Sequence, residues 1–194
     1  MDGGNAVEEH RGALGFDLPS VLAQLDGHRP AECRDAVETI QSHVTEQPDA
    51  CLPTVPKLRT LFEGPAVDCQ ADAAYCLAEL ADHSPVDVAP SVDELAAFVD
   101  DRPGHEATPA LVRALAAVSS DRPGALADHV EAVETALETD VPDARAAGAT
   151  VLGRLAAETD ADVDGVRDRL ATLAADDPDA TVRERAEVAL ERFP

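Results

Sequence analysis

The last helical segment of the chain decides the fold class. Residues 177–193 read DPDATVRERAEVALERF, with apolar side chains at Val182, Ala186, Ala189 and Phe193. Spacings of three and four residues place these side chains on one face of an α-helix. The segment therefore predicts an amphipathic helix, which must bury that face against another element.

Prolines mark the starts of similar helical segments along the rest of the chain. Proline is tolerated in the first turn of a helix, where its missing N–H has no partner in any case. Two interleaved series recur at intervals of 33–39 residues: Pro30, Pro65, Pro103, Pro142 and Pro178, and Pro19, Pro56, Pro90 and Pro123. Two interleaved series predict two helices in each repeat.

Five helix pairs follow from this punctuation, at about 17–47, 51–82, 88–120, 124–157 and 162–193. A single pair cannot bury its own apolar face, but stacked pairs share a continuous core. We therefore expect an all-α fold, an α-solenoid over residues 17–194 that follows a flexible tail at 1–16. The second helix of the third pair begins at either Pro103 or Pro109.

The second helices share a residue pattern that resembles the HEAT repeat. The last one carries Pro178, Asp179, Val182, Arg183, Ala186 and Leu190, and the fourth carries Pro142, Asp143, Arg145, Gly148 and Leu152. The pattern is weaker in the first pair, which keeps Arg34, and in the second. The chain resembles HEAT-repeat proteins, including the short HEAT repeats of the phycobilisome lyase type. In HEAT proteins the matching arginine bridges to an aspartate of the same or the next repeat, so the resemblance implies a structural ladder of Arg34, Arg145 and Arg183 with Asp143 and Asp179.

The composition is strongly acidic. The chain has 39 Asp and Glu against 15 Lys and Arg, a net charge of −24, and Lys57 is its one lysine. This composition resembles that of proteins from halophilic archaea, in which molar salt screens the self-repulsion. Such a charge disfavours nucleic acid as a partner. The N-terminus MDGGNAVEEH does not resemble a signal peptide and no apolar stretch is long enough to cross a membrane, so we expect a cytoplasmic protein with no membrane partner.

The sequence contains no motif that predicts catalysis, a metal site or a cofactor. The single His-Glu dipeptide, His105 with Glu106, cannot supply the several pairs of the di-iron HEAT hydroxylases. We therefore predict a non-enzymatic adaptor that binds another protein on its solenoid surface. The candidate partner-binding residues are Arg113, Arg154 and Arg192.

Two other functions remain open from the sequence. One is a lyase-like or regulatory HEAT protein that acts on a cofactor-bearing or enzyme partner, with Cys33, Cys69 and Cys76 as a ligand-contacting cluster. The other is a structural module that assembles end to end through its terminal helices.

Overall fold

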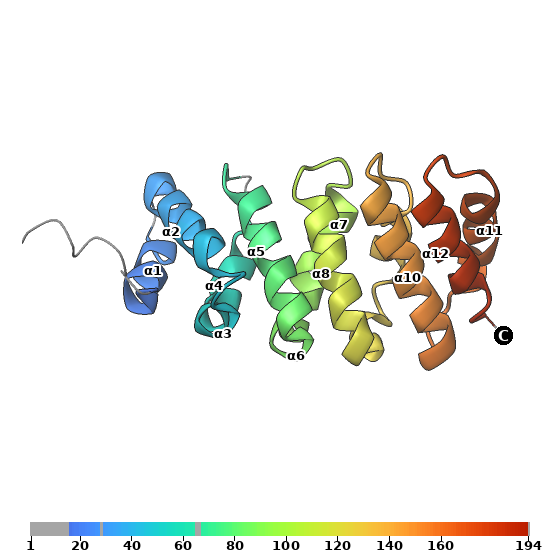
Figure 1. Ribbon diagram of the computed structural model, residues 1–194, viewed down its shortest axis with the longest axis horizontal. Coiled ribbons are helices and arrows are strands. Elements are labelled where there is room, and N and C mark those ends of the chain that lie inside the picture. Colours follow the sequence, from blue (N-terminus) through green and yellow to red (C-terminus); the bar gives the residue numbers. More distant parts are fainter. Residues whose placement is uncertain (1–15, 28, 65–66, 194) are drawn as a thin grey trace, which may run out of the picture.

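The computed structural model describes residues 16–27, 29–64 and 67–193, and over these ranges every regular element is a helix. Figure 1 shows the helices as a single row of stacked pairs, in which the second helix of each pair lies beside the second helix of the next pair. The predicted all-α repeat solenoid is therefore confirmed. The predicted N-terminal tail lies, apart from Phe16, outside the described residues.

The helices form two layers. The first-layer helices are α1 (Leu18–Leu25), α3 (Pro48–Cys51), α4 (Val55–Thr60), α6 (Pro85–Val88), α7 (Val92–Asp101), α9 (Val130–Ala136) and α11 (Arg167–Asp176). The second-layer helices are α2 (Pro30–His43), α5 (Gln70–His83), α8 (Thr108–Asp121), α10 (Pro142–Glu158) and α12 (Ala180–Leu190). Short 3₁₀ turns precede or interrupt first-layer helices at Leu52–Thr54, Ala89–Ser91, Pro123–Leu126 and Asp164–Val166.

Several helix starts follow the proline punctuation, but the start predicted at Pro178 is displaced, because α12 begins at Ala180 with Asp179 as its N-cap. Pro19, Pro30 and Pro142 each stand in the first turn of their helix. In the third repeat α8 begins at Thr108 with Pro109 in its first turn, so Pro103 does not start a helix. The expected start at Pro65 lies outside the described residues.

The core runs between the two layers along the whole row. Leucines from successive helices, among them Leu77, Leu95, Leu115 and Leu152, are fully or almost fully buried. Alanine supplies much of the remaining core, and its small side chain lets neighbouring second-layer helices pack closely. The second-layer helices α5, α8, α10 and α12 contact one another in that order.

Polar contacts between repeats join residues about one repeat apart. Arg34 pairs with Asp68 at 2.8 Å, His129 with Asp93 at 2.8 Å and Arg169 with Glu138 at 2.7 Å. These pairs of described residues each join neighbouring repeats, as expected in a solenoid.

Candidate functional site

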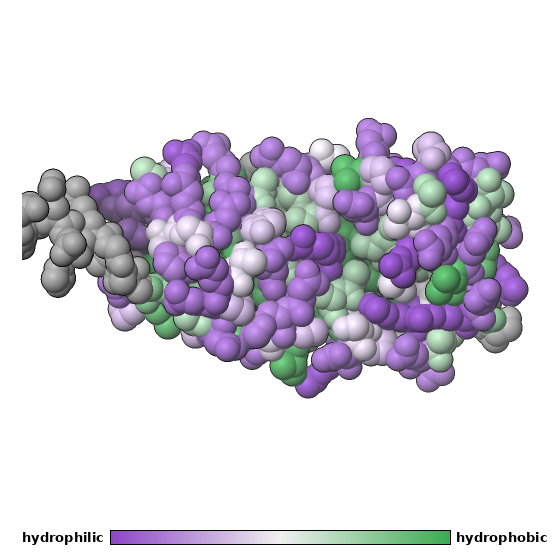
Figure 2. All heavy atoms as spheres, in the orientation of Figure 1, coloured by the Kyte–Doolittle hydropathy of each residue, from purple (hydrophilic) through white to green (hydrophobic). Residues whose placement is uncertain are grey.

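A groove of about 400 Å³ crosses the second-layer helices from the end of α5 to α12. Its floor is built of short side chains from three consecutive second-layer helices: Ala81, Ala116, Ala117, Ala146 and Ala147. Figure 2 shows mildly hydrophobic surface over α8 and α10, bordered by hydrophilic side chains. The alanines leave open a channel that longer side chains would fill.

A second hollow of about 80 Å³ continues the groove toward the C-terminal end of α12. It shares Thr150, Arg154 and Arg185 with the first and adds Val188 and Arg192. We call the two together the arginine groove, defined by the alanine floor and by Arg113, Arg154, Arg185 and Arg192. Its arginines come from three successive repeats.

Arg113, on α8, is held by carboxylates of α5. Its guanidinium donates to Glu79, its Nε lies 3.6 Å from Asp82, and its charge sits 5.6 Å from the centre of the Tyr75 ring. Burial raises the pKa of Asp82 and the nearby Arg113 opposes that rise. Arg113 is therefore already neutralised at this end of the groove.

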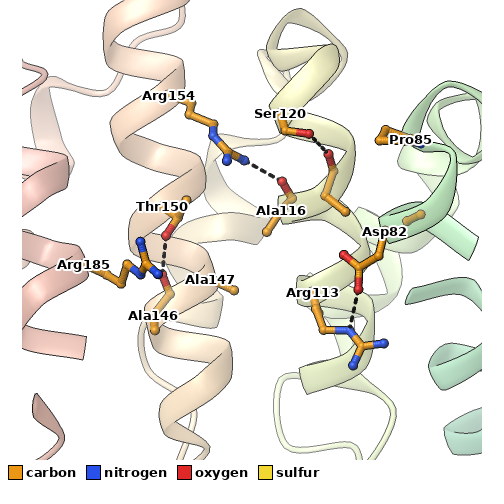
Figure 3. A pocket seen from close by; sticks show the side chains of 12 residues that line it. Asp82, Pro85, Arg113, Ala116, Ser120, Ala146, Ala147, Thr150, Arg154 and Arg185 are labelled. Atoms are coloured by element: carbon orange, nitrogen blue, oxygen red, sulfur yellow. Dashed lines mark hydrogen bonds and ion pairs between the residues drawn. The ribbon is translucent and has the colours of Figure 1, made fainter. Parts of the chain in front are cut away.

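Arg154, on α10, is anchored to α8 without a carboxylate. Its Nη1 donates to the Ala116 carbonyl at 2.6 Å and to the Ser119 hydroxyl at 2.7 Å, and Figure 3 shows the side chain reaching across from α10. Burial lowers the pKa of Arg154, and the charges of Arg192 and Arg185 lower it further. Arg192 and Arg185 thus place further positive charge beside Arg154, and the carboxylate of Glu158 offsets it in part.

Arg185 and Arg192 lie seven residues apart on and just after α12, hence on one side of that helix. Both are exposed, and within the described part of the chain neither forms an ion pair or a side-chain hydrogen bond. Figure 3 shows Arg185 extending from α12 toward α10. The groove thus gathers three cations that no carboxylate of the described residues neutralises by an ion pair.

Gly153 sets the distance between α10 and α12 beside these arginines. A Cβ atom on Gly153 would lie 2.7 Å from the Cα of Ala189 and 2.9 Å from its Cβ. Only glycine allows this approach. The close contact brings Arg154, the next residue, near Arg192 at the end of the following repeat.

In the predicted structural ladder, Arg145 pairs with a different aspartate from those implied by the HEAT pattern. Arg145 donates from Nε and Nη2 to both carboxylate oxygens of Asp177, at 2.8 and 2.9 Å, rather than to Asp143 or Asp179. Asp143 is exposed in the first turn of α10, and Asp179 caps α12 by accepting from two backbone amides. The prediction of Asp143 or Asp179 as the partner of Arg145 was wrong, because a carboxylate two residues before the cap of α12 reaches back to α10.

The other ladder arginines also contact a neighbouring segment. Arg34 forms its exposed pair with Asp68 of the next repeat. Arg183 donates to the backbone carbonyls of Asp177 and Pro178, at 2.7 and 3.2 Å. None of the predicted ladder residues lines the arginine groove.

The cysteines lie in the core. Cys33 and Cys69 approach to 3.4 Å between their Sγ atoms, and all four thiols are free and buried. Burial raises the pKa of Cys51 to about 11 and those of Cys69 and Cys76 to about 12. Protonated thiols inside the core are poorly placed to contact a ligand.

The His105–Glu106 dipeptide lies at an edge of the solenoid, beside a hollow of about 580 Å³ between the α7–α8 and α9–α10 connections. The His105 ring packs edge-on against Phe98 and its Nδ1 accepts from the Ala107 amide at 3.1 Å. Within the described ranges no three His, Cys, Asp or Glu side chains converge on a metal position. Nor, in those ranges, does any helix combine the length and the apolar character needed to cross a membrane.

The structure brings the three candidate partner-binding arginines to one groove, where sequence analysis could not assign them a common face. Arg113 and Arg154 line the larger hollow and Arg192 lines the smaller. Arg185 was missed, although its seven-residue spacing from Arg192 was a usable signal. The alanine floor was also missed, because buried and groove-lining alanines follow the same helical spacing.

The fold defines the class of protein: a helical repeat solenoid. A designed armadillo repeat protein, made for modular peptide recognition, superposes with a TM-score of 0.76 at 17% identity, covering 90% of this chain and 81% of its own. A designed armadillo repeat protein in complex with the peptide (KR)4 gives 0.75 at 16% identity, covering 90% and 80%. An engineered protein gives 0.68 at 20% identity, covering 89% and 78%.

No family model and no curated protein matches the sequence.

Proposed function

We propose that this chain is a non-catalytic binding scaffold, an adaptor that holds a segment of a partner protein in the arginine groove. The observation that carries the proposal is the groove itself, an open channel with an alanine floor and arginines from three repeats. Its volume of about 400 Å³ lies in the range of pockets that enclose a small ligand or a few residues of a peptide.

Two further facts favour a protein segment. The groove crosses several helices rather than ending in a closed cavity, so it accepts a chain that continues at both ends. The similar designed armadillo proteins are described as made for peptide recognition or as bound to a peptide. Their peptide is basic in one case, whereas the groove of this chain is itself basic.

Peptide selection tests this function without assuming the charge of the partner. A random peptide library displayed on phage is selected on the wild-type chain, and the enriched peptides are measured against Ala117→Phe/Ala147→Phe, which fills the groove floor. The matched control, Ala23→Phe/Ala171→Phe, places the same side chains on exposed positions of α1 and α11.

We expect the groove-filling variant to lose the enriched peptides and the control to keep them. Enrichment of no peptide, or equal binding to both variants, would exclude the groove as a peptide site. Circular dichroism of each variant establishes that its helices are intact.

The repeats are proposed to be of the HEAT type, since Arg145 links adjacent repeats through an aspartate as HEAT arginines do. The acidic surface is proposed to be an adaptation to the molar salt of a halophilic cytoplasm. Helicity measured by circular dichroism should then fall as KCl is diluted, because the self-repulsion of a net charge of −24 is no longer screened. Full helicity in dilute buffer would contradict the adaptation.

A further inference from the structure

The charge of the arginine groove is opposite to that of the molecule. Acidic residues outnumber basic ones by 39 to 15 over the chain, yet four arginines and one carboxylate, Asp82, line the groove. Some surface carboxylates elsewhere pair with a cation of an adjacent repeat, as Asp68 does with Arg34 of the preceding repeat. The groove beyond Arg113 lacks such a carboxylate within ion-pair distance among the described residues.

Arg154 is oriented as a fixed anion receptor. Its Nη1 is occupied by the Ala116 carbonyl and the Ser119 hydroxyl, whereas Nε and Nη2 have no hydrogen-bond partner among the described residues. A guanidinium offers two parallel N–H groups to one carboxylate, and an anchored side chain loses little entropy when it binds. Arg185 and Arg192 provide two further cations, on and just after the next second-layer helix.

From this geometry we infer that the partner segment is an extended acidic peptide, with one carboxylate on Arg154 and another on the Arg185–Arg192 pair. The inference rests on the proposed function and names the chemistry of its partner. Neighbouring helices pack about 8–10 Å apart. An extended chain rises about 3.3 Å per residue, so cations on adjacent helices match carboxylates about three residues apart.

The space between the two cation sites agrees with small residues between the two carboxylates. The hollow that holds Arg154, Arg185 and Arg192 is only about 80 Å³ and is lined between them by Thr150, Val188 and Ala189. The partner motif is therefore an acidic residue, two small residues and a second acidic residue.

Fluorescence anisotropy with labelled peptides tests this motif at the lowest KCl concentration that keeps the helices intact. The probe is GDAADAADG, the neutral control is GNAANAANG, and the clustered isomer is GAADDDAAG. We expect the probe to bind at least about tenfold more tightly than the neutral control, because each carboxylate adds a charge-assisted pair. The clustered isomer should bind at least about threefold more weakly than the probe, since it cannot reach both cation sites.

Two variants assign the binding to the groove. Arg185→Gln/Arg192→Gln should weaken the probe at least about tenfold. Arg29→Gln/Arg169→Gln removes the same charge from exposed arginines that pair with Glu32 and Glu138 outside the groove, and should change the affinity less than about twofold.

Three results with the peptides would overturn the inference: no binding of the probe, equal binding of the Asp and Asn peptides, or equal losses of affinity in the two arginine variants. A fourth would be a phosphoserine version of the probe, or an oligonucleotide, that binds more than about tenfold more tightly than the probe. The last result would assign the groove to phosphate. If the acidic peptides fail while selected peptides still require an open groove, the scaffold function stands and only its acidic partner is excluded. If the groove-filling variant also changes nothing, both fail.

Discussion

The two ends of the junction between the last two repeats use arginine in opposite ways. Near the start of α10, Arg145 is buried and bound by both oxygens of Asp177, and their side chains are 10% and 3% exposed. Nine residues further along the same helix, Arg154 faces Arg185 and Arg192 with no ion pair among the described residues. Both arginines contact an adjacent repeat, but among the described residues only the first has its charge neutralised by a carboxylate, and the second is the one for which we propose a ligand.

The two arginines differ in whether a carboxylate compensates their charge. A buried charge without a partner is costly, and Asp177 offsets that cost for Arg145. A partly exposed charge is hydrated and can remain unpaired until a ligand replaces the water. Burial and the presence of a nearby carboxylate therefore distinguish Arg145 from Arg154.

The largest expected effect on stability comes from breaking the buried ion pair between Arg145 and Asp177. Arg145→Ala leaves the carboxylate of Asp177 buried without its guanidinium and should lower the free energy of unfolding by about 3–5 kcal/mol. Urea unfolding followed by circular dichroism measures the change. Arg34→Ala, which breaks a pair whose side chains are 43% and 85% exposed, is the control and should cost less than about 1 kcal/mol. Equal losses in the two variants would contradict the contrast between buried and exposed pairs.

The pH dependence of the stability of Asp177→Asn tests the charge of the same buried ion pair. Hydrogen bonds from Arg145 hold the pKa of Asp177 below its usual value. A lowered pKa contributes stability above the unfolded-state pKa, and this contribution is lost as pH falls through the folded-state value. At neutral pH the variant should therefore be less stable than wild type by about 1.5–3 kcal/mol, the usual worth of hydrogen bonds to a charged group.

The gap in stability between the two proteins should narrow as pH falls below the unfolded-state pKa of aspartate, about 3.9, and it should close only below the lowered folded-state pKa of Asp177, where the wild-type carboxyl is neutral like the amide. Urea unfolding at several pH values measures the gap. A gap that stays constant down to pH 3 would exclude the charge of Asp177 as its source.

The repeats could be predicted from the sequence because their signals are local. A proline in the first turn and apolar residues at helical spacing are signals that lie within a single helix. Helix starts such as those at Pro19, Pro30 and Pro142 could therefore be predicted without any knowledge of packing. The partner of Arg145 could not be predicted in this way. Asp177 is separated from it by 32 residues, and only the packing of α10 against α12 selects it over Asp143 and Asp179.

The groove was predictable only in part, for the same reason. The sequence singled out Arg113, Arg154 and Arg192 as side chains suited to an interface, but helical spacing alone does not give the rotation of one helix against the next. That rotation determines that Arg113 is neutralised by Glu79 while Arg154 is not.

Gly153 lies on α10 between Arg145 and Arg154, where α10 packs closely against α12. Substituting it should lower the stability less than the two changes to the buried ion pair. In Gly153→Ala the added methyl group meets the backbone of Ala189, so α10 and α12 must separate, at a cost of about 1–3 kcal/mol. The same substitution at Gly124, where a Cβ would meet no atom within 4 Å, is the control and should be nearly neutral. Urea unfolding of both variants checks this. A Gly153→Ala protein as stable as wild type would show that the two helices move apart freely.

The smallest effect on stability is expected at the open end of the junction. Arg185→Gln/Arg192→Gln removes two exposed cations that form no ion pair with the described residues, so the free energy of unfolding should change by less than about 0.5 kcal/mol. The same substitutions also relieve the repulsion that lowers the pKa of Arg154, which opposes any small loss of packing. Urea unfolding in the buffer used for peptide binding allows both effects to be compared directly. A loss of more than about 1 kcal/mol would mean that these arginines serve the fold as Arg145 does, whereas unchanged stability with lost peptide binding assigns them to a ligand.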